Sequence, residues 1–215
     1  MQSPRRAVAV LGATGSIGRA TLDVLGSLGE GWYLAGASAH SRIEELLPLA
    51  RAQQTRVLVA TCRESAAKID EHQIPPGCQL RHGQAALVEL AADPEIDTVV
   101  AAIVGSAGML STLAAARAGK RIALANKESL VVAGSLVTGA VAESGASLIP
   151  VDSEHSAVFQ ALQAGRPGEV AKIILTASGG PFRTWSQQRL TQATVEDALA
   201  HPTWQMGRKI SVDSA

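Results

Sequence analysis

The stretch Ala7-Val8-Ala9-Val10-Leu11-Gly12-Ala13-Thr14-Gly15-Ser16-Ile17-Gly18 decides how this chain folds. Its first five residues are apolar and predict a buried strand, and residues 19–28 carry leucines at helical spacing. A strand, a glycine turn and a helix in that order are typical of sites for the pyrophosphate of a dinucleotide. The glycines let the backbone approach the phosphates, and the helix start offers N–H groups to them. The spacing, G-x-x-G-x-x-G, is a variant of the usual fingerprint, and a glycine turn without a ligand is the alternative.

Strands and helices continue to alternate after this stretch. Further strands are predicted at 32–37, 56–60, 98–104, 121–125 and 146–151, which are largely apolar, and a short one at 78–81. Residues 98–104 are apolar on both faces, which is typical of a central parallel strand whose carboxyl end lies beside a ligand. The pattern predicts an α/β protein in which residues 1–150 form a doubly wound, Rossmann-type dinucleotide-binding domain. Residues 151–215 are expected to form part of a second, α+β domain, with a second sheet that begins at 170–176.

The composition excludes several classes of protein. The 215 residues suffice for one large domain or one and a half, and 47% of them are hydrophobic, so a sizeable core can form. The formal net charge is zero and no basic block is present, which argues against a nucleic-acid partner. No apolar run is long enough for a membrane span, and the first one is too short for a signal peptide. Cys62 and Cys78 form no C-x-x-C motif, so we expect a reducing compartment, the cytoplasm, and no thiolate metal site.

The loop after the second predicted strand bears on the choice of cofactor. Proteins specific for NAD usually carry Asp or Glu there, which binds the ribose diol. Here the loop reads Ser38-Ala39-His40-Ser41-Arg42 and contains no acid. A hydroxyl, an imidazole and a guanidinium suit a 2′-phosphate, so the loop favours NADP. Ser41 and Glu44 also form a capping box, and both roles of Ser41 can coexist.

Two polar clusters follow predicted strands near the middle of the chain. Asn126-Lys127-Glu128 opens a helix, where a cation is unfavourable, so Lys127 needs an anion or an acidic partner. Pro150-Val151-Asp152-Ser153-Glu154-His155 follows a short apolar run. In a continuing strand Asp152 and Glu154 point to one face and suit Mg²⁺ or Mn²⁺, which bind oxygen ligands. The alternative is a polar strand end whose Asp caps the following helix.

Together these motifs resemble those of the 1-deoxy-D-xylulose 5-phosphate reductoisomerase family. The resemblance covers the whole chain in order, and six motifs carry it: Gly-Ala-Thr-Gly-Ser-Ile-Gly (12–18), Ala-Asn-Lys-Glu-Ser-Leu (125–130), Pro-Val-Asp-Ser-Glu-His (150–155), Ser-Gly-Gly-Pro-Phe (178–182), His-Pro-Thr-Trp-Gln-Met-Gly (201–207) and Lys-Ile-Ser-Val-Asp-Ser-Ala (209–215). Each motif alone is weak to moderate evidence, whereas six in order are very specific.

The resemblance implies an enzyme of the non-mevalonate isoprenoid pathway in bacteria, a homodimer at full length. Its members convert 1-deoxy-D-xylulose 5-phosphate to 2-C-methyl-D-erythritol 4-phosphate: a carbon–carbon bond is broken and remade, and NADPH then reduces the resulting aldehyde. The implied cofactor contacts are Thr14, Gly15, Ser16, Ile17, His40, Ser41, Arg42, Asn126, Glu128 and Gly207. The implied ligands of Mg²⁺ or Mn²⁺ are Asp152 and Glu154.

The same resemblance implies how the sugar phosphate is bound. The implied substrate contacts are Lys127, Ser153, Glu154, Ser178, His201 and Ser214, and the implied catalytic residues are Lys127, Asp152, Glu154 and His201. Residues 201–207 look like the family's mobile lid, although Trp204 and Met206 could equally be core residues.

The family pattern continues beyond Ala215 with an Asn, a Lys, a third carboxylate ligand and a helical C-terminal domain. We therefore expect the chain to be a piece of a longer protein that ends inside the catalytic domain, and to bind NADPH without turning over substrate.

Two other functions remain open at this point. Another NADP-dependent oxidoreductase, such as a semialdehyde dehydrogenase, would need a catalytic cysteine, and both cysteines lie away from the nicotinamide strands. A non-catalytic dinucleotide sensor would not need Asp152, Glu154 and Lys127 together.

Overall fold

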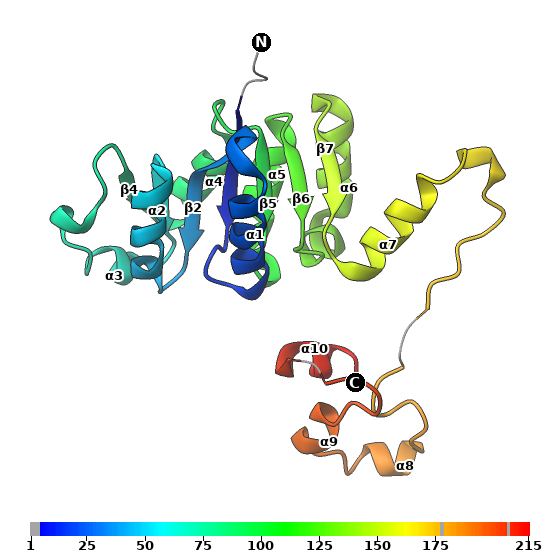
Figure 1. Cartoon of the computed structure of the whole chain (residues 1–215). Helices are drawn as coiled ribbons and strands as arrows, with labels where there is room; N and C mark the ends of the chain where they lie inside the picture. The colour runs from blue at the N-terminus through cyan, green and yellow to red at the C-terminus, as the bar shows by residue number, and fades with distance from the viewer. Residues whose placement is uncertain (1–4, 177–178, 206) are drawn as a thin grey trace. The chain divides into compact units, whose positions relative to one another are not determined.

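The chain folds into two compact units, Met1–Ala164 and Gly165–Ala215, in a computed structural model. The structure describes residues 5–176, 179–205 and 207–215, and the side chains of residues 209 and 210 are outside the description. The first unit contains the sheet, and the second contains short helices (Figure 1). The predicted division at residue 150 stays a prediction; the first unit extends further because helix α7 (Ser153–Leu162) packs against strand β7 (Ser147–Pro150).

Seven strands of the first unit form one sheet in which every pairing is parallel. The strands are β1 (Arg6–Leu11), β2 (Trp32–Ala39), β3 (Val57–Ala60), β4 (Gln79–His82), β5 (Thr98–Ala101), β6 (Arg121–Leu124) and β7. Their order is β4-β3-β2-β1-β5-β6-β7. The chain therefore runs outward from β1 to β4, returns to the other side of β1, and runs outward again. This confirms the predicted doubly wound sheet, with its switch point between β1 and β5.

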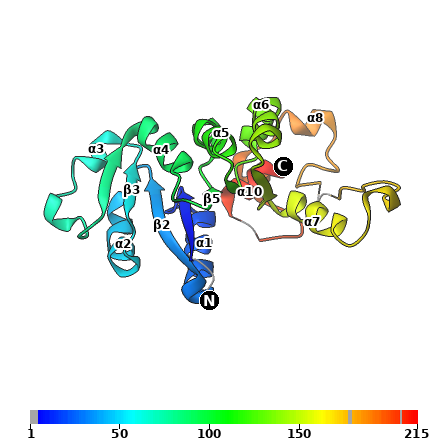
Figure 2. The same cartoon turned by 90° about the horizontal axis from the view of Figure 1, so that it is seen from above.

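Helices cover both faces of this sheet (Figure 2). The first face packs against α4 (Gly83–Ala92), α5 (Met109–Arg117) and α6 (Glu128–Ser144), and the second against α1 (Ser16–Ser27) and α2 (Leu47–Gln53). Because side chains alternate along a strand, Ala9 and Leu11 of β1 belong to the first core and Val8 and Val10 to the second. Two buried cores on one sheet explain why its inner strands β3 and β5 are buried and almost entirely apolar. A short helix α3 (Arg63–Ala66) links β3 to β4.

Some predicted element ends differ from the structure. The strand predicted at 98–104 ends at Ala101, because its neighbours β1 and β6 end at Leu11 and Leu124 and offer no further pairing. Ser41 does not cap a helix as its capping box predicted: the 3₁₀ helix η2 (Ile43–Leu46) has Arg42 as its N-cap, without a side-chain cap. The chain continues from η2 directly into α2.

The second unit contains α8 (Gln187–Leu190), α9 (Val195–Leu199) and α10 (Arg208–Asp213). The second sheet predicted to begin at 170–176 is wrong for the described residues, since 170–176 form no strand. An extended segment becomes a strand only by pairing with another, and the described part of this unit contains no other strand. In the described part of the chain, no helix is both long and apolar enough to cross a membrane.

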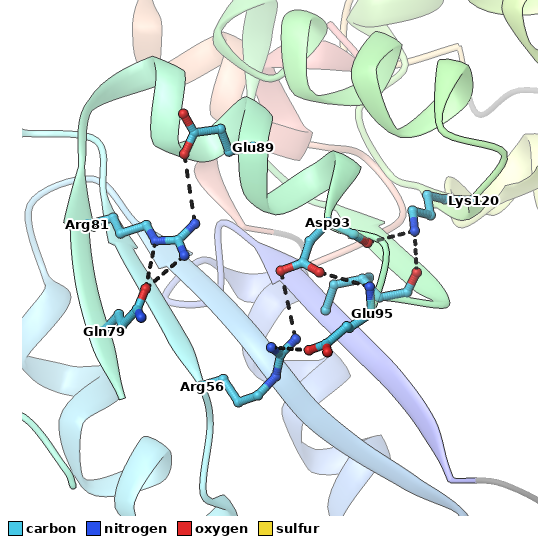
Figure 3. A network of polar contacts seen from close by, with 8 residues as sticks. Arg56, Gln79, Arg81, Glu89, Asp93, Glu95 and Lys120 are labelled. Carbon is cyan, nitrogen blue, oxygen red and sulfur yellow. Dashed lines mark hydrogen bonds and ion pairs between the residues drawn. The ribbon is translucent and has the colours of Figure 1, made fainter. Parts of the chain in front are cut away.

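A network of hydrogen bonds and ion pairs lies at the amino ends of the central strands (Figure 3). Lys120, which precedes β6, is only 7% exposed, and its Nζ donates to the carbonyls of Asp93 (2.6 Å) and Ile96 (2.7 Å) at the end of α4. Arg56, which precedes β3, pairs with the carboxylates of Asp93 and Glu95. The loop 93–97 is thereby tied to strands on both sides of β1, at the edge opposite the glycine turn.

Candidate cofactor and metal site

The glycine turn between β1 and α1 is shaped for close backbone approach. Gly12 has φ +83°, a region that favours glycine, and a β-carbon there would lie 2.8 Å from the carbonyl oxygen of Ala102. A β-carbon on Gly18 would overlap the carbonyl of Gly12 and lie 2.6 Å from Cα of Ala13. Both glycines are therefore required by packing, Gly12 against the chain after β5 and Gly18 against the turn itself.

The start of α1 fits the pyrophosphate of a dinucleotide. The helix begins at Ser16, and its N-cap Gly15 has no side chain that could satisfy the first N–H groups. Those groups have no partner within a helix and attract anions. Thr14 is buried and Ile17 is exposed. The predicted contacts Thr14, Gly15, Ser16 and Ile17 therefore lie together around one helix start.

The predicted 2′-phosphate loop lies directly beside this turn. Arg42 Nη2 donates to the carbonyl of Thr14 at 2.7 Å. His40 Nδ1 is 2.9 Å from Thr61 Oγ1, across the ends of β2 and β3. Ser38, near the end of β2, accepts from the N–H of Gly12 through its hydroxyl (3.0 Å) and from the N–H of Ala13 through its carbonyl (2.8 Å). With the Arg42 bond, three hydrogen bonds join this segment to the turn. Ser41 is exposed.

Sequence reasoning missed two charged residues in this cluster. Glu45 Oε2 lies 2.7 Å from Arg19 Nη2, and its Oε1 lies 3.5 Å from Arg42 Nη1. Arg19 Nε also donates to the carbonyl of Thr14, at 3.2 Å. The only sequence signal was position: Arg19 follows the last glycine, and Glu45 stands three residues after Arg42.

Asn126 links the loop after β5 to the start of α6. Its side chain is 2% exposed, and its Nδ2 donates to the carbonyls of Ile103 and, at 2.7 Å, Gly105. Its Oδ1 accepts from the N–H of Ser129 at 2.8 Å and from the Ser129 hydroxyl. Asn126 therefore accepts from an N–H at the start of α6, as a cap does, but Lys127 and not Asn126 is the N-cap residue. Glu128 lies in the first turn of α6.

Lys127 and Asp152 form an ion pair between the ends of β6 and β7. Lys127 Nζ lies 3.0 Å from Asp152 Oδ2, which confirms that Lys127 has an acidic partner. The Asp152 side chain is 15% exposed, and its Oδ1 lies 3.5 Å from His155 Nδ1. Burial alone raises the pKa of Asp152. The hydrogen bond and the charge of Lys127, with a smaller effect of His155, together lower it by more, so the net pKa is below its usual value. Asp152 is therefore an anion across the physiological range.

The two predicted metal ligands lie on a strand-to-helix turn and not on one strand. β7 ends at Pro150, Asp152 is the N-cap of α7, and Glu154 lies in its first turn. Ser153 Oγ donates to Glu154 Oε2 at 2.7 Å. Within the described residues no three His, Cys, Asp or Glu side chains converge as a metal site. Two carboxylates suit Mg²⁺ or Mn²⁺ only with water or substrate oxygens completing the shell, as Mg²⁺ sites commonly have.

The remaining predicted substrate residues belong to the second unit. His201 Nδ1 accepts from the N–H groups of Thr203 (3.1 Å) and Trp204 (3.0 Å), so it caps the turn it begins. Ser214 Oγ donates to the carbonyl of Ser211 at 2.8 Å. Gly207 is exposed. Ser178 and Met206 lie outside the described residues.

The parallel sheet, its switch point and the glycine turn define an α/β protein with a Rossmann-type nucleotide-binding domain. A family profile described as 1-deoxy-D-xylulose 5-phosphate reductoisomerase matches residues 8–134, and one for the C-terminal domain of that enzyme matches 148–215. The chain belongs to the 1-deoxy-D-xylulose 5-phosphate reductoisomerase family.

Individual relatives agree with this membership. The 1-deoxy-D-xylulose 5-phosphate reductoisomerase of Laribacter hongkongensis is 48% identical over 213 residues, 97% of this chain and 55% of the relative. The solved reductoisomerase from Zymomonas mobilis in complex with NADPH gives a TM-score of 0.86 at 42% identity, over 98% of this chain and 54% of that one. A solved DOX-P reductoisomerase in complex with NADPH, fosmidomycin and magnesium gives 0.82 at 41% identity, with the same coverage. The chain spans about half the length of the relatives it matches.

Proposed function

We propose that the whole protein is an NADPH- and divalent-metal-dependent enzyme that rearranges and reduces 1-deoxy-D-xylulose 5-phosphate to 2-C-methyl-D-erythritol 4-phosphate. Within it, residues 1–150 form the NADPH-binding domain and 151–215 part of the catalytic domain. The observation that carries the proposal is the Lys127–Asp152 ion pair, which follows two neighbouring strands at the same edge of the sheet as the glycine turn. Dinucleotide sites and catalytic groups of parallel sheets meet at that edge.

The residues of this chain have distinct roles in the proposal. Thr14, Gly15, Ser16 and Ile17 bind the pyrophosphate, while His40, Ser41 and Arg42 bind the adenosine phosphate. Asn126, Glu128 and Gly207 contact the cofactor on its nicotinamide side. Asp152 and Glu154 hold Mg²⁺ or Mn²⁺, and Lys127, Ser153, Ser178, His201 and Ser214 bind the sugar phosphate. When bound, the cofactor and the cation supply a hydride and a Lewis acid, respectively.

Lys127 and His201 present protons to the substrate in this scheme. Asp152 orients the ammonium group of Lys127, which can donate to substrate oxygens where negative charge develops. Because His201 Nδ1 accepts two backbone N–H groups, the neutral ring carries its proton on Nε2. That tautomer can donate a hydrogen bond to a phosphate or hydroxyl oxygen.

The cofactor assignment is tested by fluorescence titration of the chain with NADPH and NADH. We expect NADPH to bind about tenfold more tightly or better, since charge-assisted hydrogen bonds to the 2′-phosphate distinguish the two. Arg42→Ala should narrow the gap, and Arg117→Ala, which removes an exposed arginine of α5, should not. Equal affinities in the unaltered chain would refute the NADP assignment.

The metal assignment is tested by Mn²⁺ binding, measured by electron paramagnetic resonance in the presence of a substrate analogue. Asp152→Asn should weaken Mn²⁺ binding strongly, because one of two carboxylate ligands is lost, and leave NADPH affinity nearly unchanged. Asp23→Asn, which neutralises an exposed aspartate of α1, is the control. In the whole protein, Asp152→Asn should abolish NADPH oxidation on addition of 1-deoxy-D-xylulose 5-phosphate. Undiminished turnover would refute the ligand role.

We also propose that the whole protein is a homodimer in the bacterial cytoplasm. The family resemblance supports the dimer, and the source of the relatives, such as Laribacter hongkongensis, supports a bacterial setting. Sedimentation of the whole protein would test the dimer, and a monomer at micromolar concentration would contradict it.

A further inference from the structure

Arg19 and Arg42 converge on the same two acceptors beside the glycine turn. Both guanidinium groups donate to the carbonyl of Thr14, Arg19 through Nε at 3.2 Å and Arg42 through Nη2 at 2.7 Å. Both also pair with Glu45, at 2.7 Å from Arg19 and 3.5 Å from Arg42. Two elements supply the side chains: α1 carries Arg19 in its first turn, and η2 carries Arg42 at its N-cap and Glu45 within it.

The cluster has a surplus of positive charge that a ligand can reach. Two cations face one carboxylate, and the side chains of Arg19, Arg42 and Glu45 are 58%, 49% and 38% exposed. A guanidinium has five N–H donors in a fixed plane, and the contacts above occupy only part of each set. Paired guanidinium groups suit a phosphate, because each can donate to two of its oxygens.

The place of the cluster identifies which phosphate it suits. Arg19 directly follows Gly18, so the helix whose start offers N–H groups to a pyrophosphate also carries this guanidinium. Arg42 follows the carboxyl end of β2, where dinucleotide-binding sheets place the adenosine ribose. In an NAD-binding protein an acid there would accept the ribose hydroxyls. Glu45 is an acid close to that position, but both arginines engage its carboxylate.

We propose that Arg19 is a specificity-determining residue that binds the 2′-phosphate of NADPH together with Arg42. The inference rests on the proposed NADPH binding and adds a residue of α1 to a subsite otherwise formed by the loop after β2. Glu45 balances one of the two charges before the cofactor binds. The 2′-phosphate, with about two negative charges at neutral pH, then supplies the remaining counter-charge.

The test is the ratio of NADPH to NADH affinity in matched variants of the full chain. Arg19→Ala should weaken NADPH binding about tenfold and NADH binding less than about threefold, since NADH has no 2′-phosphate. The salt dependence of NADPH binding should fall as well, because a phosphate contact is lost. Arg117→Ala, another exposed arginine on a helix, should change neither affinity. Arg19→Gln keeps the first part of the side chain and a polar end without the charge. It should act like Arg19→Ala, which covers the case in which alanine prevents folding.

The outcomes separate this inference from the function on which it rests. If the unaltered chain binds NADH as tightly as NADPH, the proposed cofactor itself is wrong and the inference fails with it. If the unaltered chain prefers NADPH but Arg19→Ala or Arg19→Gln weakens both cofactors equally, only the inference fails. Arg19 would then stabilise the turn through the carbonyl of Thr14 and would not read the 2′-phosphate.

Discussion

Lys127 occupies a position where a cation is normally unfavourable, the N-cap of a long helix. The carboxylate of Asp152 at 3.0 Å offsets that cost, and in return Lys127 determines the ionisation of Asp152. Burial is the largest single influence on the pKa of Asp152, and it acts upward. The net decrease of the Asp152 pKa therefore depends on Lys127 and, to a smaller extent, on His155.

This balance predicts a higher pKa on mutation. Lys127→Met should raise the pKa of Asp152, because burial remains and the main favourable partner is gone. A ¹³C NMR titration of the aspartate carboxyl groups, with Asp152→Asn for assignment, measures the shift. Asp197 is the internal control: the N–H and hydroxyl of Thr194 hold its pKa low, and it should stay low. An unchanged Asp152 titration would show that Lys127 is not the dominant partner.

The residue types at this site could be predicted from the sequence, but their arrangement could not. The need of Lys127 for an acid was visible, because a helix start disfavours a cation. Asp152 and Glu154 were expected to share a strand face, and this depended on the strand continuing past Pro150. The strand ends there instead, since β6 ends at Leu124 opposite Pro150. Which acid meets which cation depends on sheet order, and no local pattern encodes that.

Helix α1 offers two glycines with opposite expected effects on stability. A β-carbon at Gly18 would overlap the backbone of the glycine turn, whereas one at Gly26 would meet nothing within 4 Å. Gly18→Ala should therefore destabilise the fold and weaken NADPH binding. Gly26→Ala should stabilise it by up to about 1 kcal/mol, as alanine does in a helix. Urea unfolding followed by circular dichroism compares them, and equal effects would contradict the assigned packing of Gly18.

Among the polar residues at the start of α6, Asn126 should cause the largest loss in the free energy of unfolding when it is replaced. Asn126→Ala leaves the carbonyls of Ile103 and Gly105 and the N–H of Ser129 without their side-chain partner, in a site that is 2% exposed. Buried unsatisfied groups cost about 1–3 kcal/mol each, so we expect a loss of at least about 2 kcal/mol in the free energy of unfolding. Ser135→Ala, at an exposed position of the same helix, is the control. A loss below about 0.5 kcal/mol, the usual range for surface changes, would contradict the proposed link.

Elements with two apolar faces were predicted well, and short polar elements were not. The inner strands β1, β3 and β5 were visible because both of their faces are buried, so their sequences are nearly continuous apolar runs. Ser41 and Glu44 match a capping box, yet a 3₁₀ turn begins two residues later, and Glu45 pairs with Arg19 and Arg42. Those partners come from α1 and from the loop after β2. Tertiary ion pairs of this kind override a local capping signal and leave no trace in the local sequence.

At the scale of the whole molecule, Lys120 holds the loop 93–97, through which the chain passes from α4 to β5 on the other side of β1. It is a buried cation that bonds to the main-chain carbonyls of Asp93 and Ile96, just after α4 (Figure 3). Lys120→Met should lower the free energy of unfolding by about 2 kcal/mol, because hydrogen bonds to charged groups contribute about 1.5–3 kcal/mol. NADPH affinity should not change. Lys68→Met, at an exposed lysine, should affect neither quantity. A stability equal to that of the unaltered chain would show that methionine packing replaces the two bonds.

The two compact units should also differ in local stability. The first has two extensive cores, one on each face of its sheet. In the second, Ile173, Ile174, Leu175 and Trp204 are largely exposed, and its described helices have at most six residues. Isolated helices of that length are marginal in water and need packing to persist.

Hydrogen exchange followed by mass spectrometry tests this difference without any mutation. Amides of β1, β3 and β5 should exchange only on global unfolding, because the strands are buried and paired on both sides. Amides of α8 and α9 should exchange much faster, through local opening that leaves the sheet intact. Peptides from α5 and the core-facing part of α6 serve as helical controls, since both helices pack on the sheet and on each other. If α8 and α9 were protected as strongly as α5, the second unit would have to be held by packing that its exposed apolar side chains do not provide.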